Sequence, residues 1–292
     1  MAVFILICFF LSGMTALIYQ IIWMRLISRV VGAAPFAVSA ILVVFMAGLG
    51  LGGYIAGRMS NRWLGIRLVR VYGVLEIATA VYALFVPALL MLSGGVYDIL
   101  YNNFYEHTLV FNLFVFAGAV LLLGFPTVCM GATLPILCRF YVSSLSHLGT
   151  HAGRLYGINT FGAALGALIC GFWMISTLGV WGSMLTAVFI NAAIGLTCLL
   201  IRPAEAAKQH DSEPEKTGAK TKKKKGVVPG EKSIVSENLY SRGTVKAALA
   251  VFLVSGFCAM ACEVFWTRLL GLVVGPTTYS FTIVLVTFIS GL

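Results

Sequence analysis

Charged residues are scarce in this sequence. Asp, Glu, Lys and Arg make up only 10% of the 292 residues, while hydrophobic residues make up 60%. Average soluble domains are about 45–50% apolar and about 25% charged, and a soluble protein this apolar would expose large hydrophobic patches. The composition therefore excludes most soluble enzymes and indicates an integral membrane protein.

Lysine is missing from most of the chain. Every lysine lies between Lys208 and Lys246, and only four of the ten acidic residues lie outside 204–242. A protein that binds nucleic acid spreads its basic residues over a folded face, whereas these lysines form one low-complexity run, so we expect no nucleic-acid partner. The seven cysteines form no CxxC motif and lie mostly in apolar runs, so we expect neither a disulfide framework nor a zinc site.

Long hydrophobic runs dominate the rest of the sequence. A bilayer core about 30 Å thick needs roughly 20 apolar residues per helix, and prolines within such a run kink or break it. We therefore predict an all-α fold, a polytopic transmembrane helix bundle, with Pro126 and Pro135 kinking or breaking the fourth span. The predicted spans are Val3–Leu26, Pro35–Ala56, Val69–Leu92, Leu109–Tyr141, Leu155–Thr177, Val180–Ile201, Val245–Val274 and Thr278–Leu292.

The first two spans recur near the end of the chain. Residues 10–49 align without gaps to 253–292 with 14 identities, which include Trp23 with Trp266, Arg25 with Arg268 and three pairs of glycines. Shared apolar composition does not place tryptophan, arginine and glycine in register. The repeat indicates that the first span is a structural helix rather than a signal peptide.

Loop charges predict the topology. Arginines flank the second and fourth connections, and the sixth connection carries the lysines. The positive-inside rule then places the N-terminus and these connections in the cytoplasm. Both repeats start inside and run parallel, which is the plan of major facilitator (MFS-like) transporters. We therefore expect a six-helix half (1–202), a disordered basic linker (203–243) and the start of a second half (244–292).

The end of the chain suggests that it is a fragment. The first copy of the repeat continues past the residue aligned with Leu292, so the last predicted helix would end partway across the bilayer. We expect the complete protein to continue into further helices. In the linker, Lys220–Lys225 could contact anionic lipid, and a plain solvated tether is the alternative.

Polar residues within the spans are the candidate functional site. Glu76 and Glu263 could bind a cation or a proton, and a polar contact inside the bundle, with Asn159, Asn191 or a tyrosine, is the alternative. Gln20 is the repeat partner of Glu263. Arg25 and Arg268 either join this site or extend to the outer interface, beside Trp23 and Trp266 as interface anchors.

Catalytic, cofactor and metal motifs are missing from the sequence. There is no GxSxG, HExxH or phosphate-loop pattern, and no Ser/His/Asp arrangement. His147 and His151 are four residues apart but lack an evident third ligand. We assign no catalytic, cofactor-binding or metal residue, and we expect no cofactor.

Glycines in two spans predict close helix packing. They recur at small-xxx-small spacing, which lets two helix backbones approach each other: Gly48, Gly52, Gly53 and Gly57 in one span, and Gly157, Gly162, Gly166 and Gly171 in the other. After the first of these spans, 57–67 resembles a degenerate form of the loop between helices two and three of facilitator transporters, with Asn61 in place of an acidic residue.

Five segments together resemble a known family. They are FLSGMTALIYQIIWMRLISRVVG (10–32), FMAGLGLGGYIAGRMSNR (45–62), VYGVLEIATAVYAL (71–84), MGATLPILCRF (130–140) and GRLYGINTFGAALGALICGF (153–172). As a set they resemble the membrane part of bacterial fused facilitator-like/spermidine synthase proteins. The resemblance places Glu76 at a family-like position, and Gln20 stands where the family pattern suggests glutamate.

The resemblance implies a function for the membrane part. Family members carry a C-terminal polyamine aminopropyltransferase domain, and this sequence has no counterpart of it. The first hypothesis is a membrane module that anchors such a domain and serves its substrate or product. A secondary transporter of a small solute, cationic in one version, is the second. A scaffold that binds a partner through the basic linker is the third.

Overall fold

The computed structural model describes residues 2–32, 35–60, 66–141, 148–201, 241–275 and 277–291. Within these residues the chain is helical and contains no strand, which confirms the all-α prediction. The predicted linker lies almost wholly outside the described residues, as do Asn61, His147 and Lys220–Lys225.

Six helices form the first part of the molecule. Their order is α1 (Ala2–Val31), α2 (Pro35–Met59), α3 (Ile66–Phe104), α4 (Thr108–Tyr141), α5 (Leu148–Ile169) and α6 (Ile175–Leu200). A five-residue π-helical segment, Cys170–Met174, joins α5 to α6. The chain reverses at Gly179, whose φ of 69° and ψ of −178° suit glycine alone. This turn lies within the predicted break between the fifth and sixth spans and divides the apolar stretch His151–Leu200 into two passes.

The length and apolar composition of these helices suit a membrane. Six stretches of the described chain are long and apolar enough to cross a bilayer, and the one from His151 to Leu200 turns back on itself at Gly179. A shorter apolar helix, α9 (Thr278–Ser290), follows α8 (Arg242–Val274). With 13 residues it extends about 20 Å, less than the thickness of a bilayer core.

The two copies of the sequence repeat have the same helix boundaries. The first helix of the pair ends at Val31 in one copy and Val274 in the other, and the second helix starts at Pro35 and Thr278. Both boundaries are separated by 243 residues, which is the offset of the sequence alignment. The aligned glycines at the corner, Gly32 and Gly275, both have positive φ, 84° and 95°. The repeat is therefore a repeat of structure.

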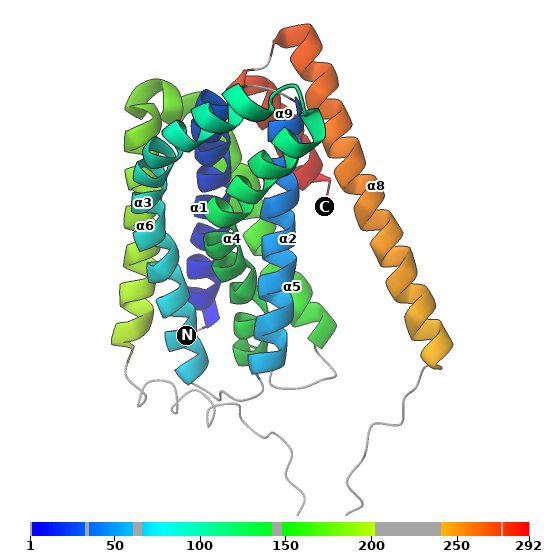
Figure 1. Cartoon of the computed structure of the whole chain (residues 1–292). Coiled ribbons are helices and arrows are strands. Elements are labelled where there is room, and N and C mark those ends of the chain that lie inside the picture. Colours follow the sequence, from blue (N-terminus) through cyan, green and yellow to red (C-terminus); the bar gives the residue numbers. More distant parts are fainter. Residues whose placement is uncertain are drawn as a thin grey trace, which may run out of the picture.

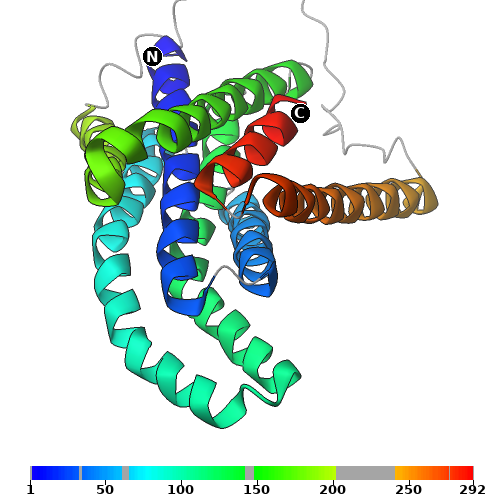
Figure 2. The same cartoon turned by 90° about the horizontal axis from the view of Figure 1, so that it is seen from above.

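The central helix of the bundle is α1. Of its most apolar 18-residue stretch, 67% is buried, whereas only 6% is buried in the corresponding stretch of α8. Figures 1 and 2 show α8 leaning away from the bundle, while α9 returns to pack beside α5. The N-terminus and the start of α8 lie toward the same end of the molecule (Figure 1), so the two repeats run parallel.

Glycines position the most closely packed helix pairs. Gly162 and Gly166 of α5 lie against the backbone of α1, and a Cβ on either would collide with carbonyl oxygens of Phe10 or Met14. Three further predicted glycines pack in the same way, and they are Gly48 and Gly52 against α4 and Gly171 against α9. Gly57 and Gly157 face open space, and a Cβ on Gly53 would meet only an ordinary contact. The packing prediction is therefore confirmed for five of the eight glycines.

Of the two predicted effects of proline on the fourth span, a kink or a break, the break does not occur in α4. The helix runs through Pro126 and Pro135 without interruption. Proline lacks the N–H that would donate to the carbonyl four residues earlier, which for Pro126 is the carbonyl of Leu122. The Tyr82 hydroxyl of α3 donates to that carbonyl at 3.1 Å. A side chain from a neighbouring helix thus satisfies the carbonyl that the proline leaves free.

Candidate functional site

The five candidate residues lie in three different surroundings. Glu76 and Gln20 are buried among the first six helices, and Glu263 is buried at α8. Arg25 and Arg268 line a cavity between the two repeats. The structure therefore brings the two arginines together and does not gather all five residues into one site.

Glu76 is held by a hydroxyl from α1. The carboxyl group is buried, with 3% of the residue exposed, and accepts a hydrogen bond of 2.5 Å from the Ser12 hydroxyl. One turn earlier on both helices, the Tyr72 hydroxyl donates to the Cys8 carbonyl at 3.2 Å. Because α1 and α3 run in the same direction, steps of four residues on each helix keep these two contacts in register.

The hydrogen-bond partners of Glu76 agree with the prediction in part. A polar contact inside the bundle was one of the two alternatives, with Asn159, Asn191 or a tyrosine as partner. Asn159 instead donates to the Phe9 carbonyl at 2.9 Å. Asn191 is buried, and its Oδ1 has no hydrogen-bond partner among the described residues. Glu76 thus has a polar contact inside the bundle. Its closest donor is the Ser12 hydroxyl, which the sequence did not single out, and the Tyr72 hydroxyl also interacts with the carboxyl group.

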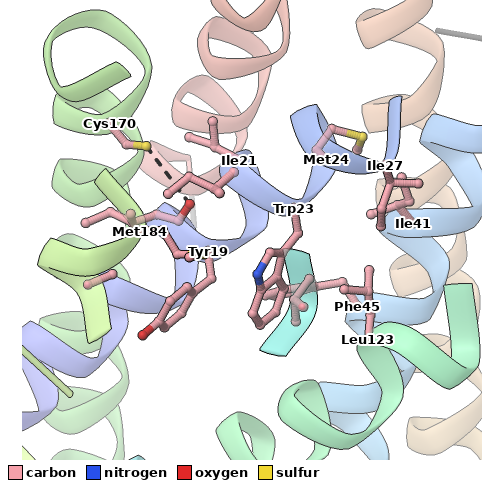
Figure 3. Packing of buried hydrophobic residues seen from close by; sticks show 14 of the residues in the cluster. Tyr19, Ile21, Trp23, Met24, Ile27, Ile41, Phe45, Leu123, Cys170 and Met184 are labelled. Carbon is pink, nitrogen blue, oxygen red and sulfur yellow. Dashed lines mark hydrogen bonds between the residues drawn. The ribbon is translucent and has the colours of Figure 1, made fainter. Parts of the chain in front are cut away.

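Buried polar atoms continue along α1 beyond Ser12. Tyr19, Gln20 and Trp23 are each at most 1% exposed, and the Tyr19 hydroxyl, the Gln20 amide and the Trp23 indole N–H lack hydrogen-bond partners among the described residues. Tyr19 and Trp23 stack with ring centroids 5.1 Å apart. Figure 3 shows both rings on the same side of α1, among apolar side chains. Unsatisfied buried polar groups are uncommon and mark places where water, an ion or a solute binds.

Trp23 does not serve as an interface anchor. Its side chain is fully buried, whereas its repeat partner Trp266 is 50% exposed on α8. The prediction is therefore wrong for Trp23, because the face of α1 that carries it packs into the core. The two copies of the repeat share their backbone and differ in their surroundings.

Glu263 is the second buried carboxylate. The residue is 6% exposed, and its Oε1 has no hydrogen-bond partner among the described residues. One turn later, the Thr267 hydroxyl donates to the Glu263 backbone carbonyl at 2.8 Å. Glu263 and its repeat partner Gln20 thus both carry a buried polar end group that lacks a full set of partners.

A cavity of about 950 Å³ lies between the two repeats. Its walls come from the last turns of α1 and α8, the starts of α2 and α9, and the segment that joins α5 to α6. Arg25 of the first copy and Arg268 of the second both line it, and the Arg25 guanidinium donates to the Thr278 hydroxyl at 3.4 Å. Repeat-related arginines therefore face one shared space.

Sequence reasoning missed other residues of this cavity. Arg29 lies one turn after Arg25 on the same face of α1 and also lines it. Hydroxyl groups add to the polar part of the wall, and they belong to Ser28, Ser176, Thr267, Thr277, Thr278, Tyr279 and Ser280. The spacing of four between the two arginines was visible in the sequence. The hydroxyls were not recognisable as a group, because they come from four separate helices.

The described residues hold no cluster of metal-ligating side chains. No group of three or more His, Cys, Asp or Glu residues comes together within them. All seven cysteines lie in the described helices as free thiols, five of them buried or partly buried and Cys258 and Cys262 exposed on α8.

Comparisons with protein-family models, with curated proteins and with solved structures find no match to this chain. The class of protein therefore follows from the described helices themselves: a multi-pass helical membrane protein with a repeated helix pair and a cavity between the two copies.

Proposed function

We propose that the chain is a facilitator-like transport module that binds a small solute between its two parallel repeats. The observation that supports this function is the cavity of about 950 Å³, because residues from both copies of the repeat line it. Pockets for small molecules typically enclose about 300–1,000 Å³. Transporters built from repeats place their substrate where the repeats meet.

Buried polar groups support a transport role as well. Charged and polar side chains within membrane spans are costly, and they commonly mark substrate or ion pathways. The buried polar groups are the Ser12–Glu76 pair of α1 and α3, Tyr19 and the unpartnered amide of Gln20 on α1, and the unpartnered Oε1 of Glu263 on α8. Of these helices, α1 and α8 border the cavity. In this proposal Glu76 and Glu263 are candidate sites for a coupling proton or cation. The module lies in the bacterial inner membrane with its N-terminus in the cytoplasm.

A solute panel tests this function. The purified protein is heated with organic cations (spermidine and putrescine) and with organic anions (phenyl phosphate and benzoate). A solute at 100 times its Kd stabilises a folded protein by about 2.7 kcal/mol, which raises the unfolding temperature. We expect at least one solute to do so, and to lose its effect in S28W, which fills the cavity.

Leu92 provides the matched control for that experiment. It is 77% exposed on α3 and does not line the cavity, so L92W adds the same bulk elsewhere. Any stabilising solute should then be tested for uptake into proteoliposomes. The function is refuted if no solute of the panel stabilises the unmodified protein or L92W, or if no stabilising solute crosses the membrane.

The sequence resemblance supports a second role. Several of the resembling segments contact one another in the bundle: 10–32 contacts 153–172 through Gly162 and Gly166, and Ser12 bonds Glu76 of 71–84. We propose that the bundle also anchors an aminopropyltransferase domain in the complete protein. Membranes that carry the complete gene product should transfer aminopropyl groups to a polyamine acceptor, and inactive membranes would refute this role.

The basic linker offers a further test. Contact of Lys220–Lys225 with anionic lipid, or with a protein partner, stays a prediction. Replacing these lysines by glutamine should reduce the affinity of a soluble linker peptide for vesicles that contain phosphatidylglycerol. Equal binding of both peptides would contradict the lipid contact, and pull-down of a partner by the unmodified peptide alone would favour the scaffold.

A further inference from the structure

We propose that the cavity between the repeats binds a phosphate-bearing organic anion through Arg25, Arg29 and Arg268. This inference rests on the proposed function and names the class of solute that its cavity takes. It differs from the cationic solute that one version of the transporter hypothesis named, because the charged residues that line the cavity are themselves positive.

The charge of the cavity wall is uniformly positive. All three charged residues among those that line it are arginines, and none of the three forms an ion pair within the described part of the chain. Guanidinium groups stay charged at every physiological pH. Arg29 and Arg268 are exposed and Arg25 is partly buried, so an anion can reach the guanidinium groups from the open side of the cavity.

The geometry suits a doubly charged head group. Arg25 and Arg268 come from equivalent positions of the two repeats and approach the cavity from opposite helices. Arginine presents a planar fork of donors that matches phosphate oxygens in pairs. The first turn of α9 also borders the cavity at Thr278 and Tyr279, and the N-terminal end of a helix favours negative charge.

The remaining walls suit an apolar body. Ile21, Met24 and Phe281 line the same space as the arginines. A volume of about 950 Å³ exceeds what an inorganic phosphate ion needs. The ligand therefore combines a phosphate group with hydrocarbon or an aromatic ring. A free organophosphate and a phospholipid from the surrounding leaflet both have this chemistry.

Interface snorkelling gives a different geometry for Arg25. A snorkelling arginine extends its head group toward water and away from the bundle. Arg25 is instead half-buried, and its guanidinium reaches across to the Thr278 hydroxyl on the opposite repeat. Its side chain is thus directed into the cavity, where a ligand would meet it.

The test measures binding directly. Phenyl phosphate is titrated into the full chain in neutral detergent by calorimetry, and benzyltrimethylammonium is the control of opposite charge. In a second arm, the protein is mixed with phosphatidylglycerol or phosphatidylcholine, and retained lipid is counted by native mass spectrometry. We expect R25Q and R268Q each to weaken anion binding about tenfold or more. R25K keeps the positive charge and preserves the fold but removes the planar set of guanidinium donors, so we expect its loss of anion affinity to be intermediate.

Arg58 provides the matched control. It lies at the end of α2, outside the cavity, where its guanidinium donates to the Tyr54 hydroxyl at 2.8 Å. R58Q should bind the anion as the unmodified protein does. Arginine-dependent binding of phenyl phosphate supports a free organophosphate, and arginine-dependent retention of phosphatidylglycerol alone supports a lipid head group.

Three results would overturn the inference: no binding in either arm, equal binding by R25K, R25Q and the unmodified protein, or tighter binding of the cation. The outcome is separate from that of the proposed function. Anion binding without uptake would refute transport and leave the anion site standing. Uptake of a cation that does not depend on these arginines would refute the anion site and leave transport standing.

Discussion

Replacing Ser12 by alanine should destabilise the bundle measurably. The substitution removes the hydroxyl that donates to Glu76, a carboxylate that is only 3% exposed. Hydrogen bonds between transmembrane helices contribute about 0.6 kcal/mol on average and up to about 1.7. Leaving a buried acceptor without its donor costs about 1–3 kcal/mol. We therefore expect the free energy of unfolding to fall by about 1–2 kcal/mol.

The repeat supplies the control for this substitution. Ser255 occupies the same position of the second copy and is exposed on α8, so S255A should change the free energy of unfolding by less than about 0.5 kcal/mol. The assay is reversible unfolding of the purified protein in mixed micelles with increasing dodecyl sulfate, followed by circular dichroism. A double-mutant cycle of S12A with E76Q measures the interaction between the two side chains, and we expect a coupling free energy of at least about 0.5 kcal/mol. Equal effects of S12A and S255A, or a coupling of zero, would refute the reasoning.

Three further predictions concern packing and exposure. G166A should lower the free energy of unfolding by about 1–3 kcal/mol, because its Cβ collides with the α1 backbone. Gly157 faces open space on the same helix, so G157A should be neutral or stabilising in the same unfolding assay. A larger loss of stability in G157A than in G166A would contradict the packing. G179A should cost about 1–3 kcal/mol because of the positive φ at the α6 turn, and an unchanged unfolding curve would be inconsistent with that turn. Brominated lipid should quench Trp266 more strongly than Trp23, because of these two residues only Trp266 is exposed. The contribution of each residue is the fluorescence that is lost in W266F or in W23F. Equal quenching would place both residues on the surface.

The helices of this protein could be predicted from hydropathy alone. A span must satisfy every backbone group internally, so apolar length translates directly into helix. The repeat added the corner at Gly32 and Gly275, because glycine in register at a helix end predicts a backbone conformation as well as a position. The continuity of α4 through its prolines could not be predicted from that segment alone, because the Tyr82 hydroxyl that satisfies the Leu122 carbonyl comes from another helix.

The candidate site was predictable only in part. Individual polar residues within apolar runs stand out in the sequence, and Glu76 and Glu263 are indeed buried. The partners of these residues depend on which helices are neighbours and in what register they pack, and the hydropathy of a sequence indicates neither of these. The convergence of Arg25 and Arg268 needed the packing of α9 against α5, a contact between segments more than 100 residues apart.

The turn at Gly179 has a consequence for how the protein enters its membrane. The stretch from His151 to Leu200 is 50 residues long, its most apolar 18 residues have a mean hydropathy of 1.9, and after Arg154 it contains no charged residue up to Leu200. A ribosome-bound translocation channel therefore meets no polar loop between these two passes. We therefore expect the pair to enter the bilayer as one helical hairpin, with the achiral residue Gly179 setting the point at which the nascent chain folds back.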